Sequence, residues 1–366
     1  MLLELLELYE RHHSQNVGLA RVRTNVGGSY LYRGDLERAR AVLTSAILDY
    51  EPHLPGDLAD QALARLSLAE VFSEMGEWDA VLGQASAALR VLERDLPRGD
   101  WHILLARALL VRALYEMGEV EGALAAGERL VAETSDEALG LRSNIQQGFA
   151  VLAGIYSARG DLGTTRALLQ RTLSAAERFL HPDDHNLQSI RGNLANVLDD
   201  LGDAYGARVL MENVLESFSR TLPEEADDLQ RARLNLAGIL SKMGKDQASL
   251  ELIERAIAVW SRPPVRNFHE LEAARVNRGR LLVKLGRIEE ALEIYEAVLT
   301  RALATLSEDH SDVQGVRRSI ALAERQRGNL ERALELEELV LAQLLERFRP
   351  EPVSYTHLTL PTIYSV

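Results

Sequence analysis

The sequence predicts an all-α fold in which similar pairs of helices are stacked one after another, an α-solenoid. Three observations support this prediction: the composition, a short pattern that recurs at a constant interval, and the placement of proline. Aromatic residues make up only 5% of the 366 residues, while leucine, alanine, glutamate and arginine are abundant. This mixture favours helix over sheet.

A short pattern recurs eight times: the end of a helix rich in small residues, then glycine, a polar residue, and then alanine and leucine. Two examples are YLYRGDLERARAVL and LVKLGRIEEALEIY. The anchoring glycines follow one another every 42 residues without an insertion, at Gly34, Gly76, Gly118, Gly160, Gly202, Gly244, Gly286 and Gly328. A fixed period of this length indicates a repeat architecture in which each unit stacks on its neighbours.

The first helix of each repeat, helix A, is predicted from the residues before the anchoring glycine. Four residues before it the side chain is large in seven repeats, and seven residues before it the side chain is mostly small, as in Ala69, Ala153 and Gly279. These spacings place the apolar positions on one face of a helix. We expect the glycine to end helix A, because it adopts the left-handed conformation without strain.

The second helix, helix B, is predicted to follow the glycine. Alanine stands five residues after the glycine in five repeats, which lets helix B approach helix A closely; Val81, Thr165 and Ser249 replace it in repeats 2, 4 and 6, where we expect looser packing. Before Val353, every proline lies 18 to 22 residues after an anchoring glycine or beyond the last repeat. Proline is excluded from helix interiors, so these segments are the loops between repeats.

The ends of the chain differ from its middle. We predict three parts: residues 1–19 as the end of a truncated preceding repeat, residues 20–349 as eight 42-residue units, and residues 350–366 as a non-native, disordered tail. The tail contains VSYTHLTLPTIYSV, which can be back-translated into a sequencing adapter. The alternative is a genuine strand that adds to a partner's sheet.

Composition and missing motifs exclude several functions. The net charge of −14 argues against binding nucleic acid or an anionic membrane surface, because both require a basic footprint. There is no cysteine, and no phosphate-binding loop, His-Glu-x-x-His or Gly-x-Ser-x-Gly motif. We therefore expect no catalytic residues, no metal and no cofactor.

The acidic and histidine-containing loops 181–185 and 308–312 recur at the repeat period, which favours capping of helix starts over metal binding.

The repeat resembles the tetratricopeptide repeat, in the 42-residue form typical of the kinesin light chain family. The phrases RGNLANVLDDLGDAYGAR and RARLNLAGILSKMGK match its helix A signature, and HPDDHNLQ and SEDHSDVQ match its inter-repeat loop. The resemblance covers about residues 1–349 and implies a right-handed superhelix. It also implies a cytoplasmic, non-catalytic protein-interaction scaffold with a concave groove, which we expect to be bacterial.

The phrases DDLQRARLNLAG and LESFSRTLPEE also resemble arrays found beside the catalytic domains of bacterial signalling enzymes. A second interpretation is therefore the recognition or sensor arm of a larger enzyme, with a CHAT protease-like, protein kinase or NTPase effector covalently linked in the full-length chain.

Polar residues line the predicted groove. Asparagine recurs nine residues before the anchoring glycine, in a column that borders the concave face in the family, and its amide can both donate to and accept from a peptide backbone. Basic neighbours follow in repeats 6 to 8, whereas Glu70, Glu74, Glu116, Asp199 and Asp200 make the middle of the groove acidic. The basic end suits an extended acidic peptide; the alternative is that these are merely solvated surface charges. The predicted peptide-binding residues are Asn193, Asn235, Lys242, Asn277, Arg280, Lys284, Arg318 and Arg325.

Arginine forms a further column, eleven residues before the anchoring glycine in seven repeats, and glutamate stands ten residues after it in five. Because helices A and B run antiparallel, we expect structural ion pairs between these two columns, each contributing at most about 1 kcal/mol on the surface. The alternative is an arginine stripe that grips a ligand. The arginines are Arg23, Arg65, Arg107, Arg191, Arg233, Arg275 and Arg317.

Overall fold

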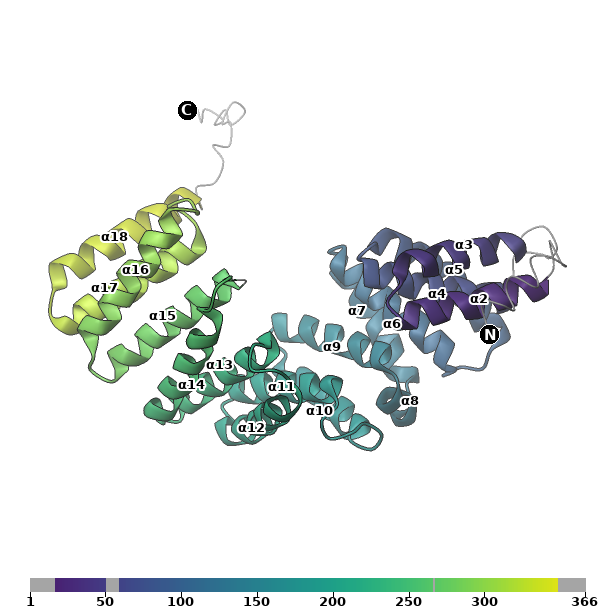
Figure 1. Ribbon diagram of the computed structural model, residues 1–366, viewed down its shortest axis with the longest axis horizontal. Helices are drawn as coiled ribbons and strands as arrows, with labels where there is room; N and C mark the ends of the chain where they lie inside the picture. The colour runs from purple at the N-terminus through teal and green to yellow at the C-terminus, as the bar shows by residue number, and fades with distance from the viewer. Residues whose placement is uncertain (1–16, 51–58, 266, 348–366) are drawn as a thin grey trace, which may run out of the picture. The chain divides into compact units, whose positions relative to one another are not determined.

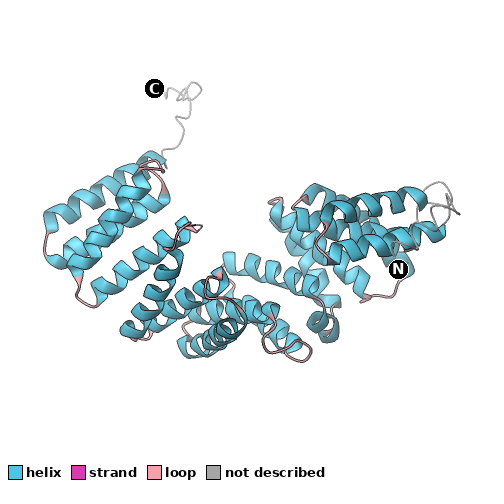
Figure 2. Cartoon of the chain, in the orientation of Figure 1, coloured by secondary structure: helices cyan, strands magenta, loops and turns pink. Residues whose placement is uncertain are grey.

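The computed structural model describes residues 17–50, 59–265 and 267–347. These residues contain 17 helices and no strand (Figures 1 and 2). The chain divides into two compact units, Met1–Thr221 (unit 1) and Leu222–Val366 (unit 2), and each is described by itself. The predicted all-α fold of paired helices is confirmed. The predicted tail at residues 350–366 and most of the predicted N-terminal remnant lie outside the described residues.

Consecutive helices form antiparallel pairs joined by tight turns. In unit 1 the helices are α2 (Val17–Tyr32), α3 (Leu36–Tyr50), α4 (Ala59–Met75), α5 (Trp78–Asp95), α6 (Trp101–Glu116), α7 (Val120–Glu133), α8 (Asp136–Leu141), α9 (Ser143–Ala158), α10 (Leu162–Ala176), α11 (His185–Asp200) and α12 (Ala204–Thr221). In unit 2 they are α13 (Asp227–Lys242), α14 (Asp246–Trp260), α15 (Phe268–Lys284), α16 (Ile288–Leu303), α17 (Ser311–Arg327) and α18 (Leu330–Arg347).

The anchoring glycine makes each tight turn. All eight have positive φ angles between 74° and 90°, and no other residue type does so in the described part of the chain. The backbone N–H that follows the glycine donates to the carbonyl that stands four residues before the glycine; Asp203, for example, donates to the Leu198 oxygen at 2.8 Å. This bond satisfies a helix-end carbonyl and ends helix A where the sequence predicts.

The core of each unit lies between the helices of a pair and between neighbouring pairs. In the alanine column of helix B, Ala39, Ala123, Ala207 and Ala291 are fully buried. Thr165 and Ser249 are buried there as well, and their hydroxyls donate to the helix A carbonyls of Ala153 (3.3 Å) and Ala237 (2.7 Å). The hydroxyl variants therefore join the two helices by a hydrogen bond, where we expected looser packing.

The arginine column of helix A is structural. Arg233 binds Glu224 through both nitrogens at 2.7 and 2.9 Å, and Arg191 binds Glu177 at 2.9 Å. Arg317, which is only 5% exposed, pairs with Glu308 at 3.2 Å. These carboxylates lie at the end of the preceding helix B or in the loop after it, not in the glutamate column we expected. Arg191, Arg233 and Arg317 thus join consecutive repeats. Arg23 instead pairs with Asp49 of its own repeat, and Arg275 with Glu272 of its own helix. These five arginines therefore have carboxylate partners within the protein, which favours a structural role over a ligand-binding stripe.

Candidate functional site

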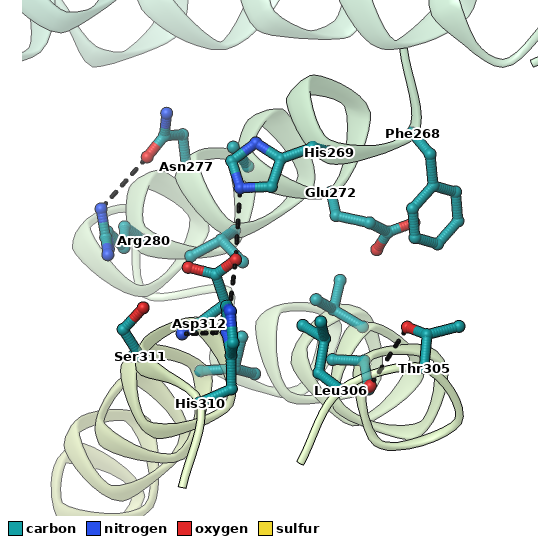
Figure 3. A pocket seen from close by; sticks show the side chains of 16 residues that line it. Phe268, His269, Glu272, Asn277, Arg280, Thr305, Leu306, His310, Ser311 and Asp312 are labelled. Carbon is teal, nitrogen blue, oxygen red and sulfur yellow. Dashed lines mark hydrogen bonds and ion pairs between the residues drawn. The ribbon is translucent and has the colours of Figure 1, made fainter. Parts of the chain in front are cut away.

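A cavity of about 470 Å³ in unit 2 lies between α15, α16 and α17 (Figure 3). We call it the unit 2 cavity. Its walls combine buried aliphatic side chains, such as Val298 and Val316, with the exposed ring of Phe268 and several polar groups. Two predicted peptide-binding residues, Asn277 and Arg280, line it from α15.

Asn277 and Arg280 are one helical turn apart, so their side chains point to the same side of α15. The Arg280 Nη1 donates to the Asn277 Oδ1 at 3.1 Å, and both side chains are exposed. Among the described residues, Arg280 is paired with no carboxylate. Its charge is therefore available to a ligand, and the asparagine holds the guanidinium beside the cavity.

The acidic groups of the unit 2 cavity are already occupied. Glu272 is held by Arg301 through both of its oxygens, at 3.0 and 2.8 Å, and by Arg275 at 2.6 Å. Asp312 accepts from His269 Nε2 at 3.2 Å when that nitrogen is protonated (Figure 3). Sequence reasoning did not assign these residues to the site. Arg301 reaches Glu272 from α16 and His269 reaches Asp312 from α15, so these contacts between helices leave no local pattern in the sequence.

The remaining predicted residues are distributed differently. Asn235 and Lys242 on α13, and Arg318 and Arg325 on α17, are exposed in unit 2 but do not line the cavity. Asn193 lies on α11, in unit 1, and is also exposed.

Lys284 is engaged within the protein. Its ammonium binds Asp246 Oδ1 at 2.7 Å and the backbone oxygen of Ser241 at 2.5 Å. It thereby ties the end of α15 to the turn between α13 and α14, which leaves it less suited to a ligand than Arg280.

The loops considered for metal binding cap helices. Asp184 accepts from the backbone N–H groups of Asn186 and Leu187 at the start of α11, and His310 accepts from that of Asp312 at the start of α17. No group of three or more potential metal ligands occurs in the part of the chain that the structure describes. The same part contains no helix long and apolar enough to cross a membrane.

A family model described as the tetratricopeptide repeat matches residues 229–262 and 273–312. These two stretches are tetratricopeptide repeats. The matched residues include α13 and α14 almost completely, and from Ala273 onwards they include much of the lining of the unit 2 cavity. A search of curated proteins found no match to the sequence.

Solved structures share the tetratricopeptide-repeat fold. A putative kinesin light chain with nearly identical repeats, from Podosopora anserina, is 23% identical with a TM-score of 0.51; the match covers 57% of this chain and 100% of that one. A Rap protein complexed with Competence and Sporulation Factor is 12% identical with a TM-score of 0.52, covering 90% and 99%. A signal transduction ATPase with a tetratricopeptide repeat sensor, from Pyrococcus horikoshii, is 12% identical with a TM-score of 0.61, covering 91% of this chain and 49% of that protein.

Proposed function

We propose that the protein is a non-catalytic interaction scaffold whose unit 2 binds an extended acidic peptide at the unit 2 cavity. The observation that carries this proposal is Arg280, a cation without a carboxylate partner among the described residues. Asn277 holds it beside a partly apolar cavity in which Glu272 is already paired with two arginines. The Rap protein, which shares the fold, was solved with a bound factor, in keeping with a binding role.

Each part of the cavity has a role in this mode of binding. A ligand carboxylate would accept charge-assisted hydrogen bonds from the Arg280 guanidinium, which are stronger than neutral ones. The Asn277 amide group can pair with a peptide group. Val276, Val298 and Val316 would bury the apolar part of a neighbouring side chain.

The test compares Arg280→Gln with Arg332→Gln. Arg332 is exposed on α18, pairs with Glu335 and does not line the cavity, so its replacement removes the same charge elsewhere in unit 2. The probe is a short end-capped peptide of alternating glutamate and alanine, titrated calorimetrically. We expect Arg280→Gln to weaken binding about tenfold, the size of one lost charge-assisted hydrogen bond, and Arg332→Gln to change it less than about twofold. Equal effects, or no binding to the wild type, would refute the proposal.

A second candidate function is the sensor arm of a larger signalling enzyme. The match to a signal transduction ATPase that has a tetratricopeptide repeat sensor favours this candidate. The match covers 91% of this chain but only 49% of the ATPase, so the ATPase has a large part beyond the region that resembles this chain. Sequencing the complete transcript tests it: an NTPase, kinase or CHAT protease-like domain in the same reading frame supports it, and a frame that holds only repeats refutes it.

A further inference from the structure

A second cavity, of about 550 Å³, lies in unit 1 and is lined by α2, α4 and α6. We call it the unit 1 cavity. Asn25 and Ser67 line it, and they occupy the same repeat position as Asn277 in unit 2, nine residues before the anchoring glycine. Leu66 and Leu105 provide a buried apolar floor, and Glu70 provides a carboxylate. The two cavities are thus built from corresponding faces of helix A.

The two cavities differ in the sign of one charge. Glu70 stands six residues before Gly76, and Arg280 stands six residues before Gly286. The same position in the repeat therefore carries an acid in unit 1 and a base in unit 2. Three residues earlier in the same two repeats stand Ser67 and Asn277, which are both uncharged. A charge of opposite sign at one repeat position favours ligands of opposite charge in the two cavities.

The neighbours of Glu70 do not neutralise it. Asn144 Nδ2, on α9, donates to Glu70 Oε1 at 2.8 Å, which is a bond from a neutral group. Burial raises the pKa of Glu70 to about 7, and the nearby Glu74 acts in the same direction; the Asn144 bond and the more distant Arg142 lower it only in part.

Three other charged or titratable side chains lie around the unit 1 cavity, and no hydrogen bond or ion pair joins any of them to Glu70. Arg142 lies over the ring of Trp101, 4.3 Å from its centroid. His102 Nδ1 lies 2.9 Å from Asp100 Oδ1. Arg33, an exposed residue in the turn after α2, also lines the cavity, but it is not one of the charges that shift the pKa of Glu70. Among the described residues Glu70 is therefore a desolvated carboxylate that forms no ion pair, since Arg142 acts on it only through space.

We propose that the unit 1 cavity binds a basic peptide segment by placing one lysine or arginine side chain against Glu70. The aliphatic stem of that side chain would pack on Leu66 and Leu105 while its charged end reaches the carboxylate, as long basic side chains do at apolar surfaces. The amide of Asn25 and the hydroxyl of Ser67 can pair with the peptide backbone on either side. This site goes beyond the proposed function, because its residues and its ligand charge are both different.

The first experiment compares Glu70→Gln with Glu74→Gln. Both variants remove one negative charge from α4, but Glu74 is exposed and does not line the cavity. In Glu70→Gln the amide oxygen of the new side chain can still accept the bond from Asn144, so the variant keeps its fold. The probe is a short end-capped peptide of alternating lysine and alanine. We expect its affinity to fall about tenfold in Glu70→Gln and less than about twofold in Glu74→Gln.

Equal losses in the two variants would show general attraction to an acidic protein and would overturn the proposal, as would absence of binding to the wild type. The unit 1 result is independent of the unit 2 test, because Arg280→Gln should leave affinity for the lysine peptide unchanged. Loss of acidic-peptide binding alone would therefore count only against the function proposed for unit 2.

A second readout follows the proton on Glu70. At pH 7 a carboxyl whose pKa is about 7 is roughly half protonated, and a bound cation favours the ionised form. Binding of the lysine peptide should therefore release up to about half a proton per site, measured by repeating the titration in buffers with different ionisation enthalpies. Glu70→Gln should abolish the release. Binding to the wild type without proton release would place the peptide away from Glu70.

Discussion

At Gly279 in α15 the absence of a side chain makes room for the ring of Tyr295 in α16. A Cβ atom built at Gly279 would lie 2.4 Å from the Tyr295 Cε1, and Tyr295 is 1% exposed. Burial also raises the pKa of the Tyr295 hydroxyl to about 12. The close approach of the two helices in this repeat thus depends on a glycine in helix A opposite a large ring in helix B.

We predict that Gly279→Ala lowers the free energy of unfolding by about 1–3 kcal/mol, because the ring must move within a packed core. Gly238→Ala is the control: Gly238 lies inside α13 with nothing within 4 Å of its Cβ position. That variant should gain about 0.5–1 kcal/mol, since alanine is the better helix former. Urea denaturation measures both, and destabilisation by both variants to the same degree would contradict the steric explanation.

Glu70 makes the stability of the protein depend on pH. Its folded pKa of about 7 exceeds the ordinary value of 4.5, so the folded state binds more protons than the unfolded state between these two values. The free energy of unfolding should therefore fall as pH rises from about 4.5 to 7, by at most about 3 kcal/mol. Glu70→Gln should lose this contribution and be more stable than the wild type above pH 7. Denaturation at several pH values tests this; an advantage independent of pH would show that ionisation of Glu70 is not the cause.

At the scale of helices, individual side chains fasten one element to the next. Lys284 joins the end of α15 to Ser241 and Asp246 at the turn between α13 and α14. The contact bridges two consecutive repeats, whereas Arg280, one turn earlier on α15, faces the unit 2 cavity. Two basic residues near the end of α15 thus differ in their contacts: Lys284 joins two repeats, and Arg280 lines the unit 2 cavity.

We predict that Lys284→Met destabilises unit 2 by up to about 1 kcal/mol, a small loss because the lysine is 47% exposed. The affinity for the acidic peptide should stay within about twofold of the wild type. A double-mutant cycle with Asp246→Asn measures the coupling of the pair by denaturation. A large loss of affinity with unchanged stability would assign Lys284 to the binding site instead.

The sequence predicts the helix pairs well because one glycine in a constant place ends each helix A. It does not predict α8, since this short helix fits within the 42-residue period and leaves no change in spacing. Asn277 is predicted from the asparagine column and Arg280 from the basic neighbours of that column in repeats 6 to 8, and their role in binding stays a prediction. The repeated positions in the sequence do not show which charged residues already have a partner of opposite charge. Arg301 binds Glu272 from the next helix, and Asp246 binds Lys284 from the preceding repeat.

At the scale of the whole molecule, each repeat is stabilised mainly by its neighbours. Leu299 in α16 and Leu341 in α18 occupy the same repeat position, thirteen residues after the glycine. Leu299 packs against the core of unit 2, whereas Leu341 is 55% exposed, together with Leu334 and Leu345 on the same helix. The same residue at the same position therefore has different surroundings in the last described pair.

We predict that Leu299→Ala lowers the free energy of unfolding by about 1–3 kcal/mol, and Leu341→Ala by less than about 0.5 kcal/mol. Thermal and urea denaturation of the two variants measure the difference. Equal, large losses would mean that the exposed face of α18 is covered in solution, which analytical ultracentrifugation of the wild type would then reveal as self-association.

The eight left-handed glycines also affect how such a chain can change its length. Because every turn repeats after the same number of residues, a gene segment that encodes one whole period can be duplicated or excised, and the junction still joins a helix B to a loop of the usual kind. An insertion of any other length inside a helix would shift the glycine out of phase with its apolar faces. Recombination between neighbouring repeats can therefore lengthen or shorten the array by whole repeats. Each added or removed repeat also adds or removes one residue at the position that Glu70 and Arg280 occupy, six residues before the anchoring glycine.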